Sequence, residues 1–368
     1  MSKEKTHPPQ YYKDYLGLDK ILKSQHLISK EYGKPAHDEM LFIIIHQIYE
    51  LWFKQILFEL DSVLAIFNKE DIKESHIGTA VSRLNRIIEI QKILIDQIHV
   101  LETMTPMDFL DFRDFLIPAS GFQSVQFRLI ENKLGLSKAD RLSYSGTDYH
   151  NHLKEPEQAK VLASESAESL FNIVEKWLER TPFLNWGVTS FWNEYEQAVA
   201  NMLADDRQVI KTNKKLSKTE KQKQLMEYKN TEASFGVVLS DKKHNKLVEE
   251  GKWRLSHKAT QAALLILLYR DQPILYNPYQ LLNKLVDVDE LFTTWRYRHS
   301  LMVSRMIGRK IGTGGSTGSK YLNKTAEKHR VFRDFSELTT FLIPRSALPQ
   351  LPQEVENNLG FFYDAQGN

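Results

Sequence analysis

The chain has 368 residues, 42% hydrophobic and 26% charged, which are ordinary values for a globular protein that buries a sizeable core. Its 49 Lys and Arg nearly balance 47 Asp and Glu, so the net charge of +2 argues against nucleic acid or an anionic membrane as a partner. The lack of cysteine excludes disulfides, thiolate zinc sites, iron–sulfur clusters and a cysteine nucleophile. Any metal must therefore be held by histidine and carboxylates, or inside a cofactor.

Glycine and proline are scarce, with 16 and 12 residues, and this favours long helices over turns. The N-terminal lysines are followed by no apolar run. The longest uninterrupted apolar stretch, Ala262 to Tyr269, is far shorter than the ~18 residues of a membrane span. These features predict a soluble, cytoplasmic protein.

Helical periodicity dominates the first part of the chain. Residues 37–68 contain no Gly or Pro, and their apolar positions nearly encircle a helix, which indicates a core helix buried on most sides. A PASG turn at 118–121 interrupts the pattern, and Gly135 is a typical helix stop. Further helices are expected over 72–101, 108–116 and 122–134.

The second part of the chain continues in the same way. Residues 207–231 include KTNKKLSKTEKQKQ and few large apolar side chains, so we expect a solvated helical arm or a partly mobile excursion. We expect helices over 157–180, 185–205, 254–270, 279–307 (opened by Pro278) and 321–342, followed by an irregular end. Because no internal repeat, long heptad run or strand series is present, one mostly α-helical domain is predicted.

The motif scan excludes several common chemistries. GTGGSTGSK at 312–320 misplaces the lysine of a Walker A loop and follows a helix instead of a strand. A di-iron carboxylate bundle needs paired Glu-x-x-His motifs, and the chain has one such spacing, from Glu4 to His7 near the N-terminus. No H-E-x-x-H helix is found, and residues 314–318 have the G-x-S-x-G spacing but follow an expected helix instead of the strand of a nucleophile elbow. Isolated polar residues in aromatic surroundings remain, and these are costly to bury without partners.

His299 is the first of these residues. Helical spacing puts Trp295, Met302 and Met306 on or near its face. A neutral imidazole on an apolar wall is what a haem iron needs on its proximal side. The same spacing also describes a core histidine satisfied by a hydrogen bond, and the spacing alone does not decide.

His46 and Arg113 are the next two. His46 lies between Phe42 and Phe53 on one helical stripe, which suits a pocket for a flat ligand but also a core histidine. Arg113 follows Phe109 by one turn, and a guanidinium among aromatic rings is a good clamp for a carboxylate. A surface ion pair with a neighbouring aspartate is the alternative for Arg113.

Two further segments are less specific. Tyr12 and Tyr15 are i,i+3 neighbours and suggest packing against another subunit or against their own core. The glycine run 312–318 is either a flexible lid, whose Thr313 hydroxyl meets a polar substrate group, or a linker.

Taken together, these segments resemble the tryptophan 2,3-dioxygenase family of haem-dependent, all-helical homotetramers. The resemblance covers well over half of the chain in the family's order, whereas 136–178 and the lysine-rich 201–232 match poorly. It implies an all-α, single helical-bundle domain over 1–368 with a haem pocket. The matching blocks are 12–22, 37–63, 101–135, 179–184, 254–273 and 278–318, with FLIPRSALP near the end.

The resemblance also implies a role for each residue position by position. His299 corresponds to the proximal ligand of one haem b per subunit, with Trp295 beside the cofactor. His46 corresponds to the distal histidine near the indole nitrogen, and Phe42 and Phe109 to aromatic residues of the pocket.

The remaining matches concern the two ends of the substrate and the cofactor edge. Arg113 corresponds to the arginine that binds the substrate carboxylate, and Thr313 to the threonine of the loop that closes over the amino acid. Ser120 and Gly121 correspond to the turn that lines the haem edge. Tyr12 and Tyr15, in the N-terminal segment 1–30, correspond to tyrosines that enter a neighbouring subunit's site, which makes the site complete only in an oligomer.

The implied reaction is cleavage of the indole ring of L-tryptophan by O2, with both oxygen atoms retained in N-formyl-L-kynurenine. Three alternatives stay open on the sequence. A related indoleamine 2,3-dioxygenase would accept D-tryptophan and tryptamine, and a diverted haem relative would give a product of another mass. A non-enzymatic helical scaffold would show no Soret band.

Overall fold

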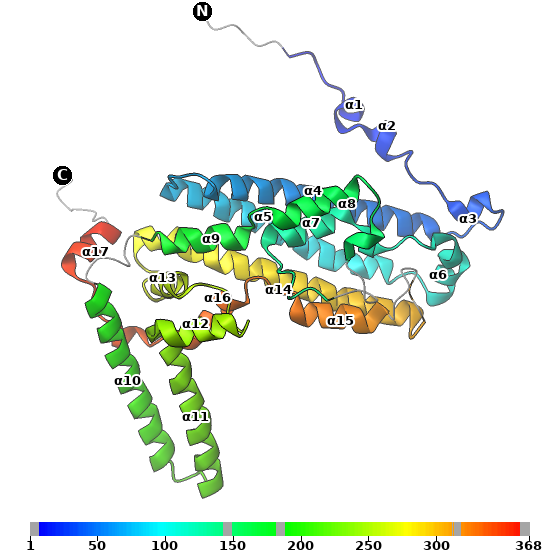
Figure 1. The fold of residues 1–368 in the computed structure, drawn as a ribbon. Helices are drawn as coiled ribbons and strands as arrows, with labels where there is room; N and C mark the ends of the chain where they lie inside the picture. The colour runs from blue at the N-terminus through cyan, green and yellow to red at the C-terminus, as the bar shows by residue number, and fades with distance from the viewer. Residues whose placement is uncertain (1–6, 143–148, 182–187, 311, 313–317, 361–368) are drawn as a thin grey trace, which may run out of the picture.

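The computed structural model describes residues 7–142, 149–181, 188–310, 312 and 318–360. Within these ranges all regular secondary structure is helical, which confirms the all-α fold expected from the sequence. Long helices lie side by side in an elongated bundle, a two-helix arm projects from one end, and the N-terminal segment projects from the other (Figure 1).

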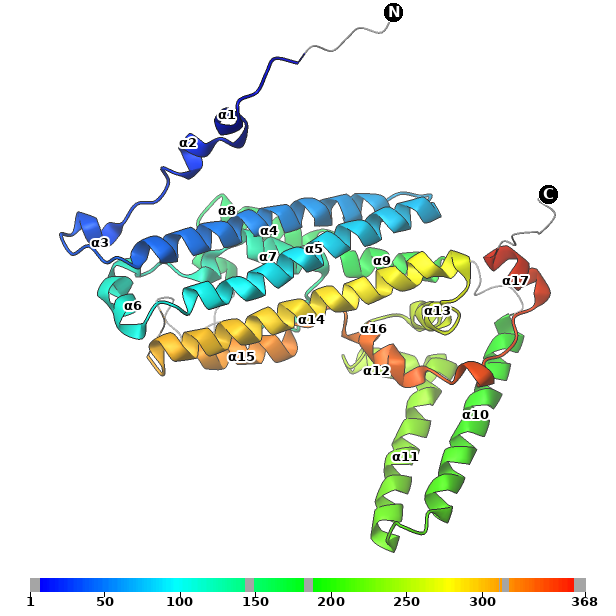
Figure 2. The ribbon, with the colours of Figure 1, turned by 180° about the vertical axis from the view of Figure 1, so that it is seen from behind.

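Three long helices form the frame of the bundle. They are α4 (Glu39–Phe67), α5 (Glu74–Leu101) and α14 (Pro273–Ile307), and Figure 2 shows them running together along most of its length. The shorter α7 (Val125–Leu134) and α9 (Leu170–Glu179) pack against α4. The absence of Gly and Pro inside α4 and the capping of α7 by Ser124, which accepts from the Phe127 N–H, account locally for these helices.

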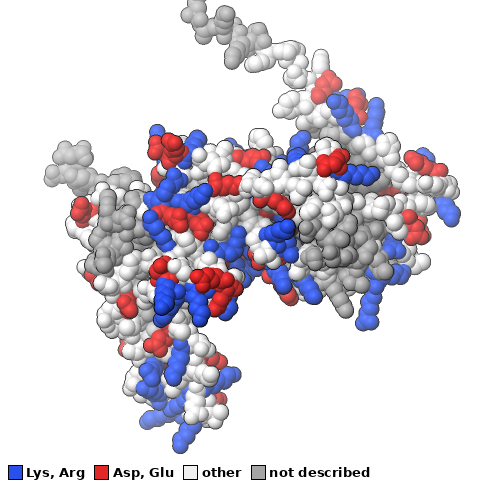
Figure 3. Space-filling view, viewed as in Figure 1, with Lys and Arg blue, Asp and Glu red and all other residues white. Residues whose placement is uncertain are grey.

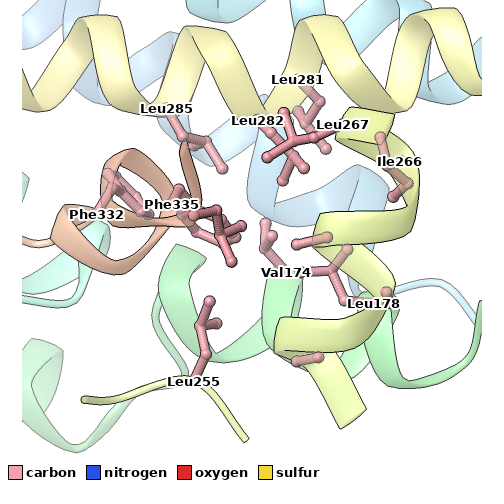
Figure 4. Packing of buried hydrophobic residues seen from close by; sticks show 14 of the residues in the cluster. Val174, Leu178, Leu255, Ile266, Leu267, Leu281, Leu282, Leu285, Phe332 and Phe335 are labelled. Atoms are coloured by element: carbon pink, nitrogen blue, oxygen red, sulfur yellow. The ribbon is translucent and has the colours of Figure 1, made fainter. Parts of the chain in front are cut away.

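The main core lies where α9, α13 (His257–Leu268) and α14 meet, and Figure 4 shows its leucine and phenylalanine side chains meeting from several helices. Nine residues of α13 are buried, which is the position expected of the longest apolar run in the chain. Full burial of one such leucine contributes about 1.5–3 kcal/mol. Leu178, Leu285 and Phe335 lie in the same cluster.

The arm consists of α10 (Val188–Thr212) and α11 (Lys218–Leu239). Ser217 begins α11 with a capping box, because its hydroxyl accepts from the Glu220 N–H while the Glu220 carboxylate accepts from the Ser217 N–H. Of the two alternatives that the lysine-rich sequence allowed, the structure has the helical arm. Lysine and arginine side chains crowd its tip (Figure 3).

The remaining helices are shorter. The α-helices are α1 (Tyr12–Leu16), α2 (Leu18–Ile21), α3 (Ile28–Glu31), α6 (Pro106–Arg113), α8 (Glu157–Ser166), α12 (Asp241–Glu249), α15 (Gly318–Lys328), α16 (Arg333–Glu337) and α17 (Gln353–Leu359). The 3-10 turns are η1 (Asp114–Leu116), η2 (Gly121–Gln123), η3 (Tyr149–His152), η5 (Leu338–Phe341) and η6 (Arg345–Ala347).

Two predicted helices are each divided in the structure. The apolar spacing predicted continuous helices, but hydrogen bonds from backbone N–H groups to polar side chains interrupt both. The helix expected over 157–180 is divided into α8 and α9, since Ser169 is extended and its hydroxyl accepts from the Asn172 N–H to begin α9. The helix over 321–342 is likewise divided into α15 and α16. Asp289 of α14 accepts from the backbone N–H groups of Val331 and Phe332, and these bonds hold the chain in a non-helical conformation.

The start of the longest helix was also misplaced. The sequence suggested that Pro278 opens it, but α14 begins at Pro273, and Pro278 is buried inside the helix. Pro273 takes the first helical position, where a missing N–H costs nothing. The helix expected over 185–205 runs on to Thr212.

Candidate active site

His299 lies on the C-terminal third of α14, stacked on Trp295 one turn earlier, with ring centroids 5.3 Å apart and planes 21° apart. Trp295 is itself fixed by Phe127, whose ring centroid is 5.2 Å away. Burial lowers the pKa of His299 from 6.5 to about 4, and His46 adds a smaller contribution in the same direction. The imidazole is therefore neutral near pH 7, and the two histidines are close enough to interact.

The donor chemistry at His299 fits a haem. Its Nδ1 is buried and has no hydrogen-bond partner among the described residues, which is unusual for a buried polar atom. Among the described residues there is also no group of three or more His, Asp or Glu that could hold a bare metal ion. A lone neutral imidazole suits a haem, because the macrocycle itself supplies the iron with its other nitrogen ligands.

His46 lies on the second turn of α4. Its Nδ1 is 2.7 Å from the carbonyl oxygen of Phe42, and the two rings are 4.1 Å apart. His46 is exposed by accessible surface, yet the nearby helices exclude enough water to lower its pKa, against the opposing effects of the Phe42 carbonyl and Glu50. When Nδ1 donates to this carbonyl, Nε2 is left as an acceptor, which is the role that an indole N–H requires.

Aromatic rings surround this histidine. The Phe42 ring lies 5.9 Å from that of Phe109 and 5.5 Å from that of Phe112, and the latter two are 5.4 Å apart. These rings belong to a small hydrophobic cluster that is distinct from the main core and includes Met302 and Met306 of α14. The cluster forms an apolar wall suited to a flat ligand. We call it the pocket cluster.

Arg113 ends α6 directly after the fully buried Phe112. Its side chain is only 16% exposed, whereas Asp114 is 86% exposed and its carboxylate lies 4.0 Å from the guanidinium. The surface ion pair that the sequence left open is therefore at the limit of contact and contributes little. A half-buried guanidinium beside aromatic rings suits a carboxylate ligand.

The turn after Arg113 is held by its own side chains. Ser120 begins η2, where its hydroxyl accepts from the Phe122 N–H. A Cβ added to Gly121 would meet nothing within 4 Å, so this backbone faces open space. Four residues on, Ser124 donates to the Glu50 carboxylate at 2.6 Å. Glu50 is one turn after His46, so this bond joins the turn to the helix that carries His46.

Known proteins are similar to this chain over nearly its whole length. The tryptophan 2,3-dioxygenase family model matches residues 2–342. The tryptophan 2,3-dioxygenase of Bdellovibrio bacteriovorus is 54% identical over 357 residues, which cover 97% of this chain and 99% of that protein. The chain belongs to the tryptophan 2,3-dioxygenase family. Family members from Dictyostelium discoideum and Xenopus tropicalis are 47% and 45% identical, over 95% and 96% of this chain and 88% and 87% of theirs.

Not every residue matched to the family lies in the pocket of a single chain. Tyr12 and Tyr15 of α1 are 76% and 75% exposed, on a segment that leads away from the bundle (Figure 1). Thr313 lies outside the described residues. The structure does bring His46, His299 and the residues of the pocket cluster together.

Sequence reasoning missed the buried ionic cluster behind Trp295. Glu131 of α7 accepts from the buried Arg128 and Arg296 and from the half-buried Arg141, and Arg296 directly follows Trp295. Burial alone would raise the pKa of Glu131, but Arg128, a hydrogen bond with His329 and the other two arginines hold it well below its usual value. The one signal in the sequence is that α7 carries charged residues, Arg128 and Glu131 among them, between apolar ones. The other partners of Glu131 are too distant in sequence to be recognised.

Proposed function

We propose that this member of the family is a haem-dependent dioxygenase that cleaves the C2–C3 bond of the indole ring of L-tryptophan. O2 is the co-substrate, and both of its atoms are retained in N-formyl-L-kynurenine, the first product of tryptophan degradation through the kynurenine pathway. The observation that supports this most is the neutral, half-buried His299, which interacts with His46 beside the aromatic pocket cluster.

In this proposal His299 holds one haem b per chain. The iron of a bound haem would supply the chemistry that activates O2. Trp295 packs along the ligating imidazole and fixes its plane, while Ser120 and Gly121 line the edge of the cofactor. Two features favour a ligand role over a satisfied core histidine. The buried Nδ1 of His299 has no hydrogen-bond partner in the described part of the chain, and burial lowers the pKa of this imidazole.

The other residues bind and orient the amino acid. The guanidinium of Arg113 donates two parallel hydrogen bonds to the substrate carboxylate. Thr313 belongs to the loop that closes over the ammonium and carboxylate groups of the amino acid. Phe42 and Phe109 enclose the indole and exclude water. Nε2 of His46 accepts a hydrogen bond from the indole N–H, which sets the orientation of the ring and leaves its C2–C3 edge toward the cofactor.

We also propose that the whole chain, 1–368, is one domain that assembles as a cytoplasmic homotetramer, with Tyr12 and Tyr15 of one subunit completing a neighbour's site. The outer face of α4 supports a subunit contact, since Leu51 and Phe58 are 52% and 70% exposed. The helix is long and apolar enough to span a membrane by length and composition. The exposed Lys54 interrupts that apolar face, which favours protein over lipid as its cover.

One experiment tests the proposed function. The protein is purified after haem supplementation, reduced without air and mixed with O2 and L-tryptophan, and N-formylkynurenine is followed by absorbance and mass. We expect a Soret band and a product that gains two oxygen atoms, both labelled when ¹⁸O2 is used. A haem-free protein, or a different mass gain, contradicts the proposal. Rapid turnover of D-tryptophan and tryptamine would instead indicate the less strict indoleamine type.

A further inference from the structure

The N-terminal segment is tied to the bundle by a short stretch, residues 24–36, which we call the root. Beyond it, residues 7–23 extend away from the bundle in both views (Figures 1 and 2). The root turns back on itself at Gly33, whose φ of +70° favours glycine, and the Lys34 N–H donates to the Ser29 carbonyl at 2.9 Å. Whatever holds the root therefore sets the direction in which Tyr12 and Tyr15 leave.

A buried carboxylate holds the centre of the root. Glu39, the first residue of α4, is 1% exposed and accepts from the backbone N–H groups of Ile28 (2.9 Å) and Ser29 (3.1 Å) and from the Ser29 hydroxyl. The Ser29 oxygen accepts in turn from the Ala36 N–H at 3.0 Å. All these donors belong to the root, and no cation pairs with Glu39 among the described contacts.

The negative charge is stabilised by helix ends. The two amides that reach Glu39 are at the start of α3, whose own residues provide no side-chain cap, and Glu39 itself occupies the first turn of the 29-residue α4. The N–H groups at the start of the four-residue α3 have no partner within that helix, and the positive end of the long α4 dipole favours a carboxylate in its first turn. Charge-assisted bonds of this kind are stronger than neutral ones, so the root is held firmly.

The root also contacts the pocket on two sides. Gln47, next to His46, accepts from the Gln25 side chain at 2.7 Å and donates to the Ser24 carbonyl. On the other side, the Tyr32 ring stacks on Phe115, with centroids 5.3 Å apart and planes 4° apart, two residues beyond Arg113. The root thus bridges the helix of the distal histidine and the segment of the carboxylate clamp.

We propose that Glu39 is a positioning residue, which fixes the root so that the N-terminal segment and the two pocket walls keep a set relation. This inference rests on the proposed function, because it gives Tyr12 and Tyr15 their place in a neighbouring site. In Glu39→Gln one acceptor oxygen becomes an amide that points donors at donors. The root then loosens, although no group that touches the substrate has changed.

The test compares Glu39→Gln with Glu59→Gln in the haem-loaded, full-length protein. Glu59 is a matched control, since it lies on the same helix, is also 1% exposed and forms ion pairs with Arg83 and Arg86, whose side chains are 36% and 50% exposed. Hydrogen exchange of a peptide spanning the root and steady-state kinetics with L-tryptophan are measured for both. In Glu39→Gln we expect at least tenfold faster exchange in the root and a KM raised at least threefold, with kcat within twofold.

Equal behaviour of the two variants in either measurement overturns the proposal, as does faster exchange of the root with an unchanged KM. If Glu39→Gln does not fold, Gln25→Ala undergoes the same measurements, and an unchanged root overturns the proposal. This variant removes the part-buried bond to Gln47 together with the exposed bonds to Ile21 and Ser24. If the wild type itself does not turn over tryptophan, the proposed function fails, and exchange of the root alone then decides whether Glu39 holds the segment.

Discussion

At the scale of single residues, the state of His299 depends on its burial. Because the folded protein binds this proton only near pH 4 and the unfolded chain binds it near 6.5, the full stability is present above 6.5 and is lost as the pH falls toward 4. The contribution is at most about 3 kcal/mol.

This predicts a measurable slope in the haem-free protein. Its free energy of unfolding, from denaturant titrations between pH 7.5 and 4.5, should decrease as the pH is lowered. The free energy of unfolding of His299→Leu should decrease less steeply over the same range. A slope remains in the variant, because burial also lowers the pKa of His46, His244 and His329. Identical slopes for the two proteins would show that position 299 does not titrate as described.

Arg113 offers a second test at this scale. In the proposed site, Arg113→Ala leaves the substrate carboxylate without its partner. We expect kcat/KM for L-tryptophan to fall by a factor that corresponds to a loss of about 2–5 kcal/mol in transition-state binding. Arg113→Lys keeps the charge but loses the planar fork, so it should recover only part of the loss. Unchanged kcat/KM in Arg113→Ala would refute the clamp.

The residues that the sequence predicted for the site share one property. His46, Phe42, Phe109, Arg113 and His299 lie in long helical blocks, where the apolar period makes a polar residue conspicuous and the family resemblance assigns each a role. Glu39 and Glu131 could not be recognised, because their importance comes from partners that only folding brings near. Arg296, for instance, is 165 residues from Glu131.

At the scale of elements, α14 is fixed to α7 by ionic contacts as well as by packing. Arg296 donates to Glu131 at 3.0 Å and to the His329 carbonyl at 3.0 Å, and its guanidinium also lies near the rings of Phe127 and Phe292. These contacts hold the segment of α14 that carries Trp295 and His299. The sequence predicted that α14 is a helix. It could not predict how this helix is rotated about its axis relative to α7.

Breaking this link should destabilise the protein strongly. Arg296→Leu removes one partner of a buried ion pair, and we expect a loss of about 3 kcal/mol in the free energy of unfolding, measured in urea. Arg298→Leu, two residues along the same helix, is the control, because Arg298 is 31% exposed and contacts Glu102 and the exposed His99. Its cost should stay within about 0.5 kcal/mol. Similar losses in both variants would argue against the link.

At the scale of the whole molecule, the charged tip of the arm is remote from the pocket. Between positions 207 and 223 one arginine and six lysines face a single acidic residue, Glu220. The arm leaves the bundle at the end opposite α6, as both ribbon views show (Figures 1 and 2). Screening by salt removes most of its electrostatic influence over such a span.

Reversing charge at the tip should therefore leave catalysis alone. In the double variant Lys214→Glu and Lys215→Glu, both at exposed positions, we expect kcat/KM for L-tryptophan to stay within twofold, while retention on a cation exchanger falls. A tenfold loss of kcat/KM would show instead that the arm takes part in the reaction.

The pocket cluster and the main core are separate hydrophobic clusters, with Tyr49 and Trp295 packed against both. Selection for a new substrate could therefore reshape the rings around His46 at modest cost to thermal tolerance, because leucines elsewhere provide most of the cohesion. Tyr49 and Trp295 are exceptions. A library that spares these two positions should yield more folded clones than one that randomises the whole lining.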